Sequence, residues 1–113
     1  LEAKPLGYKP VMAHPERHRM VTVETYETLL APIVQEGACL QLTAGSILGL
    51  FGEPVRATAL AIAERFSSSI VVASDAHNIS LRAPRVKEAY TALDRLQSGL
   101  AQRVTDTLKA LLS

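Results

Sequence analysis

Two short polar segments carry the side chains of this sequence best suited to chemistry. They are AHPER at 13–17 and SDAHN at 74–78. His14, Asp75 and His77 provide imidazole and carboxylate groups, which bind Mn, Fe or Zn without any thiolate. Taken singly, each is better explained by a structural role, which is a hydrogen bond within a turn for the histidines and a loop cap for Asp75. A metal site therefore requires that the fold bring the two segments together.

The apolar pattern predicts elements that would do this. Three short apolar runs read as strands, and four longer segments with helical spacing or opening on proline read as helices. The strand centres are about 30 residues apart, the size of a βα unit, which indicates a parallel sheet and an α/β fold. Pro32 should kink the first helix or split off its last turn. The predicted strands are 8–13, 38–43 and 70–73, and the predicted helices are 22–36, 54–66, 84–97 and 100–112.

In parallel α/β folds, functional residues gather where the carboxyl ends of the strands meet. AHPER, TAGS at 43–46 and SDAHN each follow a predicted strand, so all three should face one rim. This convergence favours a partial metal shell over three unrelated turns. The forked cation of Arg17 suits a phosphate. Glu16 is left open as a ligand, a support for a histidine, or a solvated acid.

Composition restricts the class of protein. The chain has 113 residues, of which 48% are hydrophobic and 20% charged, as expected for one globular domain. The net charge of +1 argues against a nucleic-acid surface. The single cysteine, Cys39, excludes an internal disulfide and is expected to be buried in a strand. No apolar run approaches the roughly 20 residues of a membrane span, and no signal peptide is seen, so a cytoplasmic location is expected.

Three longer segments carry a resemblance to a known family. They are PVMAHPERH, LTAGSILGLFGEPVRATAL, and ASDAHNISLRAP followed by KEAY. They resemble the C-terminal half of PHP-domain proteins, and above all the bacterial tyrosine phosphatases associated with capsule and exopolysaccharide synthesis. The resemblance implies a distorted (β/α)7 barrel, of which residues 1–113 would form the C-terminal part of a single PHP domain. It also implies a cluster of metal ions, usually Mn²⁺ with Fe²⁺ or Zn²⁺ as alternatives.

The resemblance also implies roles for individual residues. By matching position, His14, Asp75 and His77 would be metal ligands, Arg17 would hold the substrate phosphate, and Arg82 would lie near that phosphate. The substrate would be a phosphotyrosine protein that regulates capsule or exopolysaccharide synthesis, with a bacterial tyrosine kinase as a candidate partner. Neither nucleic-acid binding nor membrane insertion is implied.

The departures from the family pattern concern mainly what is absent. Family members open with an HxH motif and carry further His and Glu ligands before HPER, whereas this sequence contains only three histidines and begins at Leu1. We therefore expect a fragment with an incomplete metal shell and little activity of its own. Its strip of three strands would have two unpaired edges and should pair with another copy or with the missing half. The alternatives are a PHP phosphatase acting on histidinol phosphate or a phosphosugar, a non-catalytic PHP-like module, and an unrelated α/β domain.

Overall fold

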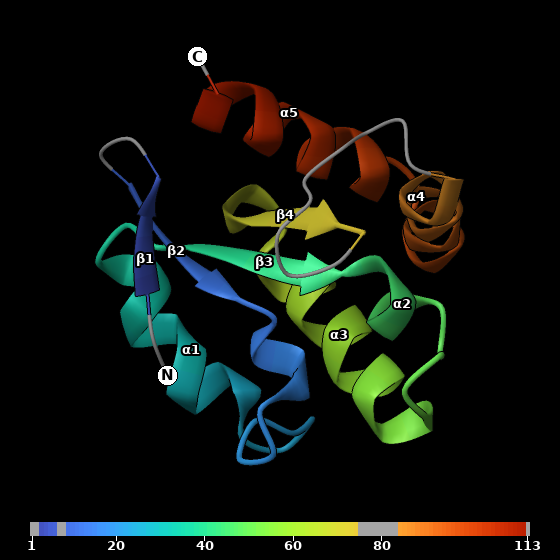
Figure 1. Cartoon of the computed structure of the whole chain (residues 1–113), viewed down its shortest axis with the longest axis horizontal. Coiled ribbons are helices and arrows are strands. Elements are labelled where there is room, and N and C mark those ends of the chain that lie inside the picture. Colours follow the sequence, from blue (N-terminus) through green and yellow to red (C-terminus); the bar gives the residue numbers. More distant parts are fainter. Residues whose placement is uncertain (1–2, 7–8, 75–83, 113) are drawn as a thin grey trace.

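The sheet confirms the predicted parallel arrangement and adds one strand. The computed structural model describes residues 3–6, 9–74 and 84–112. Its sheet has the order β1-β2-β3-β4, in which β2, β3 and β4 are parallel (Figure 1). These three strands match the three predicted runs closely. The bounds are β1 (Ala3–Leu6), β2 (Lys9–Ala13), β3 (Cys39–Thr43) and β4 (Ile70–Ala73).

Strand β1 was not predicted, and it corrects the expectation that β2 lies at a free edge. It pairs antiparallel with β2, with Lys4 opposite Val11 and Pro5 opposite Pro10. Proline has no N–H for a strand ladder and is tolerated mainly at sheet edges, so the two prolines obscured the hairpin in the sequence. Within the described residues, the outer strands of the sheet are therefore β1 and β4.

The helices also follow the predicted order. They are α1 (Tyr26–Gln35), α2 (Ala44–Ile47), α3 (Glu53–Arg65), α4 (Pro84–Leu96) and α5 (Leu100–Leu112), with single 3₁₀ turns η1 (Pro15–Arg17) and η2 (Ser67–Ser69). The short α2 and both 3₁₀ turns were not predicted. None of the helices in the described part of the chain is long and apolar enough to cross a membrane.

The first helix differs from its prediction at both ends. It begins at Tyr26 rather than at residue 22, because the preceding residues form a turn in which the N–H of Thr22 donates to Oγ1 of Thr25 at 2.9 Å. The helix then continues through Pro32 to Gln35, so the last turn is not split off. Pro32 lies on the exposed side of α1.

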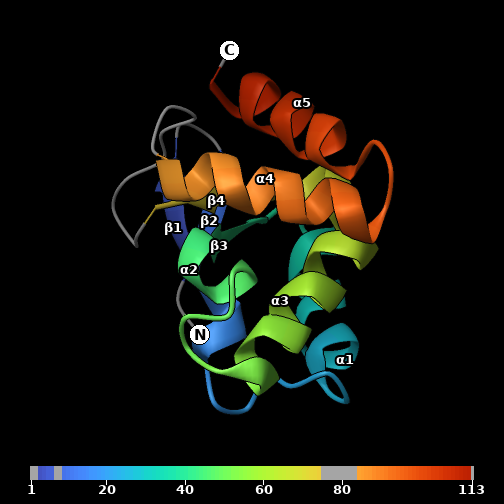
Figure 2. The same cartoon turned by 90° about the vertical axis from the view of Figure 1, so that its right-hand side faces the viewer.

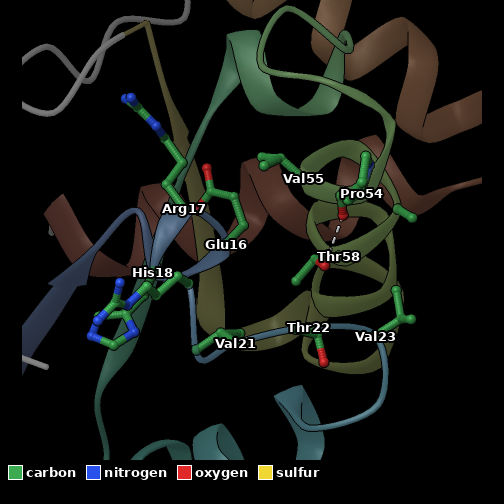
Figure 3. Close-up of a pocket in the computed structure, with 11 residues that line it drawn as sticks. Glu16, Arg17, His18, Val21, Thr22, Val23, Pro54, Val55 and Thr58 are labelled. Atoms are coloured by element: carbon green, nitrogen blue, oxygen red, sulfur yellow. Dashed lines mark hydrogen bonds between the residues drawn. The ribbon is translucent and has the colours of Figure 1, made fainter.

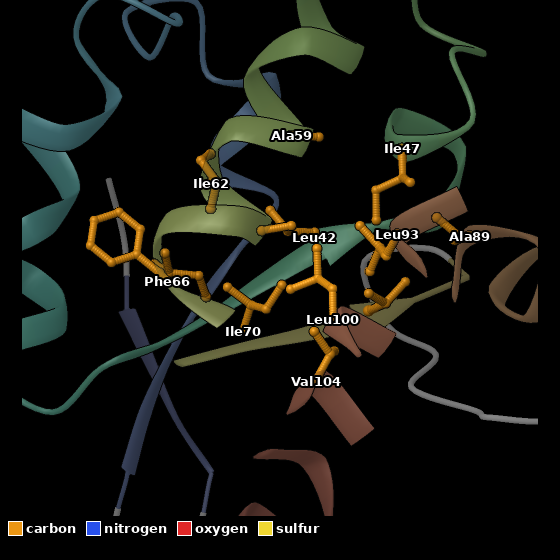
Figure 4. Close-up of a cluster of buried hydrophobic side chains, with 14 of the residues drawn as sticks. Leu42, Ile47, Ala59, Ile62, Phe66, Ile70, Ala89, Leu93, Leu100 and Val104 are labelled. Atoms are coloured by element: carbon orange, nitrogen blue, oxygen red, sulfur yellow. The ribbon is translucent and has the colours of Figure 1, made fainter. Parts of the chain in front are cut away.

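One face of the sheet carries the main core. Side chains alternate along each strand, and the inward set of Leu40, Leu42, Ile70 and Val72 packs against α1, α3, α4 and α5 (Figure 4). Burying an aliphatic side chain of this size stabilises a fold by about 1.5–3 kcal/mol. This face is therefore the main source of the stability of the fold.

The opposite face holds a smaller cluster formed by Val11, Cys39, Val71 and Leu108. Cys39 is buried there, as predicted. Helix α5 contributes Leu100 and Val104 to the main core and Leu108 to this cluster, so it spans the β4 side of the sheet. Figure 2 shows α5 packed beside α4. The helices thus support the strands whose carboxyl ends form the predicted rim.

Candidate functional site

Two of the predicted strand ends meet at one edge of the sheet. Ala13 is the register partner of Gln41, and the N–H of His14 donates to the carbonyl oxygen of Gln41 at 2.7 Å. On the other side of β3, Thr43 is paired with Ala73, two residues before Asp75. The rim predicted from the sequence is therefore present for β2 and β3.

The backbone of His14 adopts an unusual conformation. Its φ and ψ are 34° and 58°, in the left-handed region, and it is the one non-glycine residue with positive φ among those the structure describes. Histidine visits this region more readily than most residues, but the conformation still costs energy and tends to occur at functional sites. Pro15 then opens the η1 turn. This sharp turn leaves the half-buried imidazole at the end of β2.

Glu16 fastens the turn to the neighbouring strand. Its side chain is only 2% exposed, and Oε2 accepts a hydrogen bond from the N–H of Thr43 at 2.9 Å. Burial raises the pKa of this carboxyl, although the hydrogen bond from the Thr43 N–H and the charge of His14 each oppose the rise. Oε1 of Glu16 and Oγ of Ser46 complete no hydrogen bond within the described residues. Glu16 is thus a buried support for the turn and not a solvated acid.

Arg17 extends from the same turn and is exposed. Its guanidinium lies over the ring of Phe51, with Cζ 4.1 Å from the ring centroid. In Figure 3 the Arg17 side chain extends away from Val21 and Thr22. The η1 turn therefore presents an imidazole and a guanidinium at the same edge, the two groups that the sequence assigned to metal and phosphate.

A cavity not foreseen from the sequence lies beside this turn. It has a volume of about 330 Å³ and opens between the segment after η1 and the first turns of α3 (Figure 3). Val21, Val23, Pro54 and Val55 give it an apolar lining, while Arg17, His18 and Arg19 stand at its side. No signal in the sequence could have found it, because it is formed by segments more than 30 residues apart.

The remaining predicted site residues cannot be placed. Asp75, His77 and Arg82 lie outside the described residues. Within the described part of the chain, no group of three or more His, Cys, Asp or Glu side chains could hold a metal ion. The one predicted ligand that is described, His14, fits such a role because a strained backbone holds its imidazole at the carboxyl end of a parallel strand.

Comparisons with known proteins agree with this geometry. Residues 2–108 match the family model described as capsular polysaccharide synthesis, CpsB/CapC. The tyrosine-protein phosphatase YwqE of Bacillus subtilis is 38% identical over 109 residues, which cover 94% of this chain and 41% of YwqE. The Staphylococcus aureus protein CapC is 36% identical over 89 residues, which cover 79% of this chain and 34% of CapC.

A solved structure leads to the same family. It is one of the crystal structures of YwqE from Bacillus subtilis and CpsB from Streptococcus pneumoniae, described as metal-dependent tyrosine phosphatases. It superposes with a TM-score of 0.73 at 38% identity and covers 94% of this chain and 42% of the solved chain. The chain thus spans about two fifths of the length of these relatives. Because the family model extends over nearly all of the chain, the chain belongs to the CpsB/CapC family of capsular polysaccharide synthesis proteins.

Proposed function

We propose that this chain is the C-terminal part of a metal-dependent tyrosine-protein phosphatase with a PHP-type distorted (β/α)7 barrel. The main support is the η1 turn, which holds His14 and Arg17 at the carboxyl ends of parallel strands in a chain 38% identical to YwqE. We use the term full-length protein for the protein that joins this chain to the rest of the family domain. The activity belongs to that protein.

In this proposal His14, Asp75 and His77 contribute ligands to a metal site, with Mn²⁺ as the expected ion and Fe²⁺ or Zn²⁺ as alternatives. A bound divalent ion of this kind lowers the pKa of water and neutralises phosphoryl oxygens. The other ligands come from outside this chain, because the sequence contains only three histidines.

The two arginines bind the substrate phosphate. Arg17 and Arg82 each present a planar fork of N–H donors that matches a pair of phosphoryl oxygens and takes up charge that develops as the phosphoester bond breaks. Glu16 keeps Arg17 in reach of the rim by tying the η1 turn to the N–H of Thr43. Cys39 takes no part as a nucleophile, since it is buried in the second cluster.

The substrate in this proposal is a phosphotyrosine protein that controls capsule or exopolysaccharide synthesis in the cytoplasm, such as a bacterial tyrosine kinase. Pairing of this chain with the rest of the domain, or with a second copy, would complete the sheet. The family description and the names of the relatives support this assignment.

The test is Asp75→Asn in the full-length protein, measured by manganese content and by phosphate release from a phosphotyrosine peptide. The change keeps the size of the side chain and removes its charge, so both quantities should fall by at least about tenfold. Arg17→Ala should leave manganese content unchanged and lower turnover, and Arg17→Lys should also lower turnover because an ammonium cannot reproduce the fork.

Two results would contradict the proposal. One is normal manganese content and normal turnover in Asp75→Asn. The other is a wild-type protein that releases phosphate from histidinol phosphate and not from the phosphotyrosine peptide, which would assign it to another class of PHP phosphatase.

A further inference from the structure

The contact between Arg17 and Phe51 sets this arginine apart from the other cations near the rim. Arg17 Cζ lies 4.1 Å from the centre of the ring, a typical distance for a cation stacked on an aromatic face. Among the residues that the structure describes, the carboxylates in ion pairs are Glu53 and Glu27, whose partners are Arg56 and Arg65. The observed side-chain partner of Arg17 is therefore a neutral ring and not an acid.

Phe51 is itself held firmly, although its side chain is 44% exposed. It lies in the loop between α2 and α3, and its Cε2 would be only 3.0 Å from a Cβ at Gly45. The ring thus packs directly on the backbone of α2. Gly49 and Gly52 have φ values of 87° and 100°, which only glycine adopts readily. The N–H of Leu50 also donates to the carbonyl oxygen of Gly45 at 2.9 Å, so the loop has a defined shape.

A ring is a suitable support for an arginine that must bind phosphate. Stacking uses the face of the guanidinium and leaves its N–H donors, which lie in the plane, free for oxygen ligands. A carboxylate would occupy those donors and neutralise the charge. A long exposed side chain with no support would lose considerable rotamer freedom on binding, and a preformed contact reduces that loss.

We propose that Phe51 is a positioning residue for Arg17: its ring holds the guanidinium at the carboxyl edge of the sheet with its donors free for a phosphate group. This inference rests on the proposed function of Arg17 in phosphate binding. It assigns a role to the loop between α2 and α3, which in this scheme does not contact the substrate.

Kinetics of the full-length protein test the role directly. In Phe51→Leu, the KM for a phosphotyrosine peptide and the inhibition constant of inorganic phosphate should rise together, by about two- to fivefold, as expected for an exposed cation–π contact. Phe51→Tyr keeps the ring and should stay close to wild type in both constants. A rise in KM without a rise in the phosphate constant would mean that the ring contacts the substrate directly, and the proposal would be wrong.

Two control variants separate positioning from a general structural effect. Leu50→Ala alters the neighbouring exposed side chain, which is 56% exposed and also lies near the Cβ position of Gly45. It should leave both constants unchanged. In an Arg17→Ala background, Phe51→Leu should add no further loss. An equal additional loss in that background would show that Phe51 acts independently of Arg17 and would overturn the inference.

A measurement that needs no activity decides the matter if the full-length protein proves not to be a phosphatase. The {¹H}-¹⁵N nuclear Overhauser effect at Nε reports how mobile an arginine side chain is. Arg17 should be more ordered than Arg19, an exposed arginine of the same segment, and this difference should disappear in Phe51→Leu and persist in Phe51→Tyr. Equal mobility of the two arginines in the wild-type protein would refute the contact itself, whatever the enzyme does.

Discussion

The helix-covered face of the sheet and its carboxyl edge are built on opposite principles. The face consists of apolar side chains that are entirely buried, such as Leu40, Leu42 and Ile70. The edge contains a strained histidine, a buried carboxyl with a raised pKa, and an exposed cation stacked on a half-exposed ring. None of these edge features is what stability alone would select. Such conflicts between local preference and fold are expected where a protein does chemistry.

Substitutions in the two regions should therefore have different effects. Losses on the helix-covered face should appear first as losses of stability. Losses at the edge should appear as losses of metal or phosphate binding, with small or even favourable effects on stability. Similar responses to substitution in the two regions would contradict this division.

The largest expected effect is on phosphatase activity, because in our proposal this chain supplies only part of the metal ligands. The 113-residue chain should show little or no phosphate release from a phosphotyrosine peptide, whereas the full-length protein with Mn²⁺ should be active. Three ligands from one chain bind at most one ion well, and only weakly without surrounding support. The two proteins are compared at matched metal concentration. Similar turnover by both would show that the ligands outside this chain are not needed.

The helix-covered face provides the next largest effect. Leu42→Ala removes a side chain of 0% exposure from the centre of the main core and should lower the free energy of unfolding of the full-length protein by about 2–5 kcal/mol. Urea unfolding measures this loss. At temperatures where the variant remains folded, its metal content should be normal. A loss of metal in a fully folded Leu42→Ala protein would mean that core and edge are not separable.

At the edge, a change at His14 should separate function from stability. With φ at 34°, a residue with a Cβ pays about 1–2 kcal/mol that glycine avoids. His14→Gly should therefore be more stable than His14→Ala by about 1 kcal/mol. In an ordinary strand the order is the reverse, because glycine loses more chain entropy on folding than alanine does. Urea unfolding of the metal-free proteins gives the difference. Both variants should bind less metal, and an alanine variant as stable as the glycine variant would show that the backbone is unstrained.

Much of the fold could be predicted from the sequence because its signals are local. Runs such as IVVA at 70–73 are apolar on both faces, as buried parallel strands must be, and helices α3 and α4 open with a proline near their first turn. Strand β1 escaped prediction because its pairing with β2 is a property of the hairpin and not of either segment. The start of α1 was misplaced because the N–H and the hydroxyl of Thr22 bond to the Thr25 hydroxyl, which shapes residues 22–25 as a turn that precedes the helix.

The site was predictable only in part, because some of its contacts depend on tertiary packing. The positions of His14 and Arg17 follow from the rule that parallel strands bring their carboxyl ends together. The support by Glu16 spans 27 residues to Thr43. The support by Phe51 depends on a glycine that lets a ring approach α2. Contacts of this kind arise from tertiary packing, so no local sequence pattern predicts them.

The smallest expected effect concerns a polar group among the apolar side chains of the helix-covered face. Tyr90 of α4 packs against the main core, and its buried hydroxyl completes no hydrogen bond within the described residues. Burial raises the pKa of Tyr90 above its usual value of 10.0. The folded state therefore holds this proton more tightly than the unfolded state. Its contribution to stability is fully present below pH 10 and is lost as the pH rises through the folded-state pKa.

Tyr90→Phe should remove this dependence while leaving the packing in place. The free energy of unfolding of the variant, measured from pH 8 to about pH 11, should fall less steeply at the alkaline end than that of the wild type, because one fewer group binds protons differently in the two states. Near neutral pH the variant should be equal to the wild type or more stable by up to about 1 kcal/mol, since phenylalanine buries no unpaired hydroxyl. The difference between the two curves isolates Tyr90 from the lysines that titrate in the same range. If that difference were constant across the alkaline range, the Tyr90 hydroxyl would have to be solvated in the folded protein. The helix-covered face would then admit water at Tyr90, and its contrast with the carboxyl edge would be weaker.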